Sequence, residues 1–162
     1  MARTSHAVLI ADQLRRAFEG DAWHGPALLE ILVGVDAKAA AAKPIANAHS
    51  IWELVLHIAV WDSAAVRRLA GEKYQPTGEA NFPPVRKPTE AAWRKAVADA
   101  KRTHGKLVKI VAALSESRLA DRVPGKRYNF LHMLHGVAQH ELYHAGQIAI
   151  LKKAAIEQVG KQ

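Results

Sequence analysis

Apolar positions recur at helical spacing along most of this chain. From residue 51 to about residue 70 they return every three or four positions, and Ser50 with Glu53 forms a capping-box signature at the start of that segment. A second run is expected to begin after Thr89 and to alternate spacings of three and four, as in a bundle seam. Its seam positions are Trp93, Val97, Ala100, His104, Leu107, Val111 and Leu114. These patterns predict two long amphipathic helices.

The first and last parts of the chain show the same periodicity. Residues 4–19 and 26–35 each carry a helical pattern, with breaks expected at Gly20 and at Gly25, which precedes a proline. The last helix is expected to run from about residue 129 to about residue 154. Strand-type runs are scarce, so the sequence predicts an all-α protein.

A stretch rich in Pro and Gly, residues 71–88, separates the second and third predicted helices. Eighteen extended residues can span up to about 59 Å, whereas a helix of 20 residues is about 30 Å long. This loop can therefore travel the length of a bundle and let the second and third helices run parallel. We expect one domain over residues 1–162, a four-helix bundle with a long crossover between helices two and three.

The amino-acid composition limits which metal ligands the protein can offer and where in the cell we expect it. The 162 residues include no cysteine, so a bound metal would need imidazole or carboxylate ligands. No apolar run approaches the roughly 20 residues of a membrane span, and Asp12 interrupts the N-terminal apolar stretch too early for a signal peptide. These features predict a cytoplasmic protein with no membrane partner.

The net charge of +8 is concentrated in residues 86–127, which hold twelve basic and four acidic residues. A basic segment can attract nucleic acid. Here, however, the basic residues alternate with Ala and Val at helical spacing and form no recognition motif. We therefore expect a solvated helix face and no specific nucleic-acid partner.

The candidate functional residues are histidines that could bind a metal ion. His140 and His144 lie four residues apart and so project from one helix face. Together with His57 in the second helix they predict a three-histidine metal site with an open fourth position, as in catalytic centres. The same run matches the H-E-x-x-H motif of zinc proteases, but no suitable third ligand follows it. His104 is expected to be a core residue.

Further residues are candidates for the surroundings of this site. Glu141 falls inside the apolar arc of the last helix, where a carboxylate is costly unless a cation or a histidine pairs with it, and it is the candidate catalytic group. Asp62, Glu141 and Gln147 are the expected partners of the ligand imidazoles. The candidate pocket residues are Trp23, His24, Trp61, Tyr143 and Gln147. His132 and His135 point away and are expected at the surface.

Four segments resemble the DinB-like (DinB/YfiT) family in the same order: EGDAWHGPALLEIL, AHSIWELVLHIAVWD, RRLAGE and LHGVAQHELYHAGQIAILKK. The resemblance implies an up-down-down-up four-helix bundle and a divalent metal held by His57, His140 and His144. Family members often have Asp where Glu141 stands. Many resemble metal-dependent hydrolases or transferases that use low-molecular-weight thiols, and some are homodimers.

These observations favour a metal-dependent enzyme, a thiol S-transferase or a hydrolase, acting on a small-molecule substrate. The expected cofactor is Zn or Ni, with a low-molecular-weight thiol as a possible cosubstrate and a homodimer as the expected assembly. The alternative is a non-catalytic, metal-binding stress-response bundle. Nucleic-acid binding through the basic helix ranks last because no recognition motif supports it.

Overall fold

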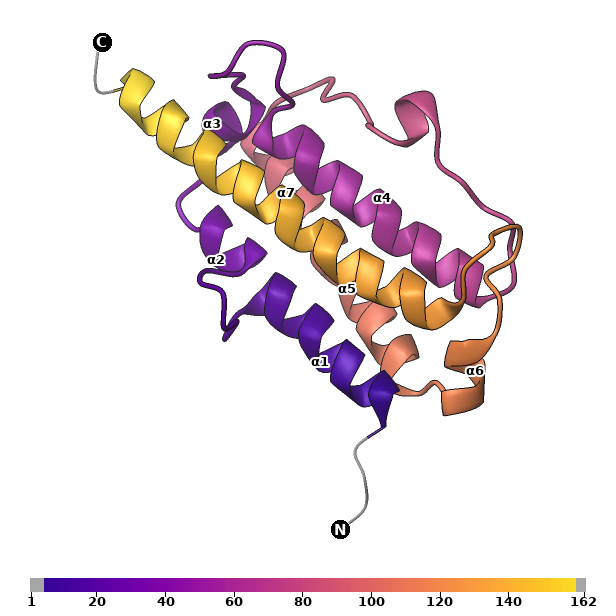
Figure 1. The fold of residues 1–162 in the computed structure, drawn as a ribbon. Helices are drawn as coiled ribbons and strands as arrows, with labels where there is room; N and C mark the ends of the chain where they lie inside the picture. Colours follow the sequence, from indigo (N-terminus) through magenta and orange to yellow (C-terminus); the bar gives the residue numbers. More distant parts are fainter. Residues whose placement is uncertain (1–4, 160–162) are drawn as a thin grey trace.

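The computed structural model describes residues 5–159, and every regular element in that range is a helix (Figure 1). Four long helices form the body of the molecule: α1 (His6–Glu19), α4 (Ile51–Leu69), α5 (Glu90–Ala112) and α7 (Phe130–Val159). Helices α4 and α1 each pack against both α5 and α7. The all-α prediction is confirmed. None of the helices within residues 5–159 combines the length and apolar content that a membrane span requires.

The capping box predicted at the start of α4 is present. The Glu53 amide donates to Ser50 Oγ over 3.2 Å, and the Ser50 amide donates to Glu53 Oε2 over 2.9 Å. Two amides that would otherwise lack partners at the helix start are thus satisfied. Thr89 caps α5 in the expected place, accepting from the Ala92 amide over 3.3 Å.

The segment after α1 departs from the prediction. Instead of a helix over the whole of 26–35, the chain forms the shorter α2 (Leu28–Leu32), and a further short helix that the pattern did not predict, α3 (Ala37–Ala41), follows it. Gly34 adopts a φ of 78°, which stops the first of these helices. Asp36 then starts the second by accepting from the Ala39 amide over 2.8 Å. Two further short helices, η1 (Gly78–Ala80) and α6 (Glu116–Ala120), lie in the connections.

The crossover after α4 runs along the outside of the bundle to the start of α5 (Figure 1). Arg68, which is buried near the end of α4, holds the first part of it. Its guanidinium donates to the Tyr74 carbonyl over 2.9 Å and to Gln75 Oε1 over 2.8 Å. The long loop is therefore tied to the helices, and its later residues return to the side of α4.

The buried core consists of two apolar clusters with a polar layer between them. Along α4, Ile58 belongs to one cluster and Ala65 to the other, and along α5, Ala100 and Leu107 are divided in the same way. Three buried polar residues fall at the boundary, one on each of three helices: Asp62, His104 and Glu141. We call them the core cluster. His104 is thus a core residue, as expected.

Candidate metal centre

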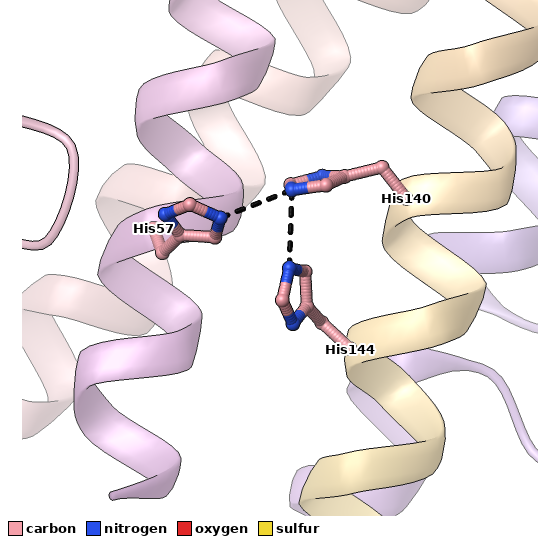
Figure 2. A group of neighbouring side chains, drawn as sticks. All are labelled: His57, His140 and His144. Carbon is pink, nitrogen blue, oxygen red and sulfur yellow. Dashed lines mark hydrogen bonds between the residues drawn. The ribbon is translucent and has the colours of Figure 1, made fainter. Parts of the chain in front are cut away.

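Three imidazoles meet between α4 and α7. His57 comes from α4, and His140 and His144 come from α7, so that their rings fill the space between the two helices (Figure 2). The Nε2 atom of His140 lies 3.0 Å from His57 Nε2 and 3.1 Å from His144 Nε2. Nitrogen ligands about 2 Å from a tetrahedral ion lie about 3.3 Å apart. The spacing of this histidine cluster is thus close to that of a three-histidine metal site.

Hydrogen bonds on the far side of two rings determine which nitrogen carries the proton. His57 Nδ1 lies 2.7 Å from the Asn81 carbonyl oxygen, and His144 Nδ1 lies 2.6 Å from Gln147 Oε1. Both oxygens can only accept, so both Nδ1 atoms must donate. In the neutral ring Nε2 then has a free lone pair, which in both cases is directed at the centre of the cluster. Such outward bonds to carbonyl oxygens are typical of metal-bound histidines.

Burial keeps these imidazoles neutral. It lowers the pKa of His140 to about 3, assisted by the neighbouring rings of His144 and His57. It also lowers the pKa of His57 and of His144. Since only a neutral imidazole binds a metal, all three rings are in the binding form at neutral pH.

The crossover supplies partners that the sequence analysis missed. Asn81, just after η1, accepts from His57 through its carbonyl and from Trp61 Nε1 through its side chain over 2.9 Å. The Phe82 ring stacks on the His57 ring with 3.8 Å between centroids, and His49 stacks on Phe82 at 3.9 Å. The loop therefore fixes the orientation of His57 from outside the two ligand-bearing helices.

Comparison with known proteins agrees with this geometry. The family model of the DinB superfamily matches residues 21–148 of the chain, a range that includes all three histidines. The chain belongs to the DinB superfamily. No curated protein and no solved structure matches it. The family resemblance seen in the sequence is thereby confirmed, whereas α1, before residue 20, lies outside the matched range.

Glu141 lies elsewhere in this DinB-superfamily protein. Its side chain is fully buried, and Oε1 lies 3.0 Å from Nδ1 of His104 on α5. Asp62 Oδ2 lies 3.2 Å from the same nitrogen. We expected Asp62 and Glu141 to orient the ligand imidazoles, but neither is hydrogen-bonded to the histidine cluster. The partners there are Asn81 for His57 and Gln147 for His144. Burial and the Asp62 charge raise the pKa of Glu141.

Two hollows flank the histidine cluster. One, of about 240 Å³, is bordered by His140 and Trp61 and also by the exposed His132, to which the sequence analysis gave no role in the site. The other, of about 350 Å³, is bordered by Gln147 and by His49 and has mainly apolar walls. A small molecule could therefore approach the cluster from either side.

The remaining candidate pocket residues are dispersed. Tyr143 is exposed, with its ring edge-on to His144 at 5.0 Å between centroids. Trp23 and His24 are also exposed and border a different hollow, of about 420 Å³, which includes residues of α1 and His135 on α7. The structure thus groups Trp61 and Gln147 with the histidine cluster and separates Trp23 and His24 from it.

Proposed function

We propose that this protein is a metal-dependent enzyme that acts on a small molecule, with a divalent transition metal bound by His57, His140 and His144. The observation that supports this proposal is the convergence of three Nε2 atoms, two of them on rings whose Nδ1 protons are donated outward. Three imidazole ligands suit Zn or Ni and leave one position open. The arrangement we assign to the bundle, up-down-down-up, is supported by the crossover between α4 and α5.

A divalent ion with three neutral ligands lowers the pKa of a water or a thiol that reaches its open position. The chain's own residues supply orientation: Asn81 and Gln147 hold two of the rings, and Phe82 covers one face of His57. Within residues 5–159, no Ser or Lys side chain forms a hydrogen bond with the histidine cluster, and the sequence contains no Cys. The nucleophile is therefore water or a low-molecular-weight thiol, which makes the protein a hydrolase or a thiol S-transferase.

The decisive experiment is an activity screen of the metal-loaded protein. Several low-molecular-weight thiols are tested against a general electrophile such as a chlorobimane, alongside ester and amide hydrolysis. We expect turnover that a chelator removes and that His140→Ala abolishes, since the variant loses a ligand. His135→Ala is the matched control, because His135 lies on the same helix and is exposed. Turnover that survives in His140→Ala would contradict the proposal.

The alternative is a non-catalytic bundle in which the metal stabilises the fold or is sensed. One observation favours it: among the described residues, no carboxylate that could act as a general base is hydrogen-bonded to the histidine cluster. Full metal occupancy with no turnover in any of the thiol, ester or amide assays would support this alternative.

A further inference from the structure

The core cluster brings together one group from each of three helices: Asp62 from α4, His104 from α5 and Glu141 from α7. Their side chains are 1%, 0% and 0% exposed. His104 Nδ1 lies 3.2 Å from Asp62 Oδ2 and 3.0 Å from Glu141 Oε1, and a ligand atom from each residue lies within 4.8 Å of the others. Two carboxylates and an imidazole thus converge at the centre of the bundle.

Of the four carboxylate oxygens in this cluster, only Asp62 Oδ2 takes part in a hydrogen bond, with His104 Nδ1 at 3.2 Å. Asp62 Oδ1 and both oxygens of Glu141 are buried and form no hydrogen bond with any described residue, although Glu141 Oε1 lies within ion-pair distance of His104 Nδ1, at 3.0 Å. A buried polar atom without a partner destabilises the folded state, and it does so more strongly if it is charged. Native proteins rarely retain several such atoms side by side. The cluster therefore has the composition and the unsatisfied oxygens of a site that takes a cation.

We propose that Asp62, His104 and Glu141 form a second divalent-metal site, distinct from the histidine cluster and filled by Mn²⁺ or Fe²⁺. Carboxylate oxygens with a single imidazole suit these harder ions better than three imidazoles do. The ligand distances of 3.0 and 3.2 Å need to open only slightly to reach the spacing of about 3.3 Å around an ion with 2 Å bonds. Without a metal, Asp62 and Glu141 raise the pKa of His104 to about 10 against the effect of burial, so the protonated imidazole balances their charge. A dication would release this proton and take over its role between the two carboxylates.

The surroundings give this second site a structural role. The Phe18 ring of α1 stacks on His104 with 4.1 Å between centroids, and apolar clusters lie on both sides along the bundle. The site is thus closed to solvent, unlike the histidine cluster, where His140 is partly exposed. An ion there would link α4, α5 and α7, and it would enter as the bundle folds. The inference does not depend on the proposed enzymatic function.

The test measures the metal content of refolded protein. His57→Ala removes a ligand of the histidine cluster and leaves the core cluster intact, and His104→Gln is added to it in a double variant. Both are unfolded in urea with chelator, refolded with Mn²⁺, desalted and examined by elemental analysis, with circular dichroism as the check of folding. We expect about one Mn²⁺ per chain in His57→Ala and less than about a tenth of that in the double variant.

A folded His57→Ala protein without Mn²⁺ would overturn the proposal, and so would equal Mn²⁺ in the single and double variants. If His104→Gln fails to fold, Asp62→Asn replaces it as the nearly isosteric change. A second measurement needs no core variant: Mn²⁺ should raise the urea midpoint of His57→Ala, since the ion binds only the folded state. Zn²⁺ binding is also measured in the single variant His104→Gln, which keeps all three histidines of the histidine cluster. This measurement tests the histidine cluster independently of the core cluster.

Discussion

Gln147 lies less than one helical turn after His144 and accepts the Nδ1 proton of that ring at 2.6 Å. Loss of such a partner typically weakens metal affinity 10- to 100-fold, because the ring loses its fixed tautomer and orientation. We expect Gln147→Ala to raise the dissociation constant for Zn²⁺ by about this factor, as measured by competition with a chromophoric chelator. Gln139→Ala, an exposed position on the same helix, should leave affinity unchanged. Equal affinity in both variants would contradict this role of Gln147.

Glu141 shows what the sequence can and cannot predict about a single residue. Its place in the apolar arc of α7 indicated correctly that the carboxylate is buried and paired. One residue along a helix turns the side chain by about 100°, so Glu141 cannot share the direction of His140. The sequence could not say which group on another helix would meet it. That partner, His104, depends on how α5 packs against the rest of the bundle.

The positions of Asn81 and Phe82, in contrast, could not be predicted from the sequence at all. They lie in a Pro- and Gly-rich loop without periodicity, so no sequence pattern placed them at the histidine cluster. Their position follows from the path of the crossover, which returns to the side of α4. The ligand histidines, in contrast, could be predicted, because a spacing of four residues on one helix fixes a shared face.

At the scale of the element, the start of α4 depends on a charged capping residue. Burial opposes ionisation of Glu53, but the Ser50 amide and the Lys43 ammonium outweigh it and lower the pKa of the carboxyl. A lowered pKa in the folded state stabilises the protein above the unfolded value, and this gain is lost as the pH falls through the folded value. We expect Glu53→Gln to lower the free energy of unfolding by about 0.5 kcal/mol at pH 7.

That difference should shrink as the pH falls below the ordinary glutamate value of 4.5, which urea unfolding at several pH values can measure. Glu79→Gln is the control, because its carboxylate is largely exposed in the crossover. A difference that grows on acidification would contradict the role assigned to Glu53.

The helices themselves were predictable to differing degrees. Long amphipathic segments with caps, α4 and α5, begin and end close to the expected residues, because periodicity and capping agree there. Helices of five residues, such as α3 and α6, contain too few positions to show a period. The early end of α2 and the separate helix α3 were not predicted, because a single glycine, Gly34, redirects the chain between them.

At the scale of the whole molecule, metal should stabilise the bundle. Zn²⁺ at about 100 times its dissociation constant adds about 2.7 kcal/mol if it binds only the folded state. For a chain of this size that corresponds to a rise in Tm of about 5–10 °C. We expect this rise in the wild type and in His135→Ala, but not in His57→Ala, by differential scanning calorimetry of chelator-treated protein. A rise of the same size in His57→Ala would argue against the histidine cluster as its source.

The last prediction concerns DNA binding by the basic face of α5. All six basic residues of this helix are exposed: Arg94, Lys95, Lys101, Arg102, Lys106 and Lys109. Asp99 already pairs with two of them. We expect DNA binding to be weak and indifferent to sequence, and to fall at least about tenfold between 50 and 200 mM salt, as measured by fluorescence anisotropy. Sequence-selective binding that persists at 200 mM salt would point instead to a specific nucleic-acid partner.

The distance along the chain between the ligands sets an order of events during synthesis. His57 and His140 are 83 residues apart, an interval that a ribosome covers in about 4 to 17 seconds at 5–20 residues per second. During that time α4 and the crossover can already place Asn81 and Phe82 against His57, while the partner helix does not yet exist. The histidine cluster can close only once α7 has emerged, so a nascent chain arrested before residue 140 would hold His57 in place and still bind no metal.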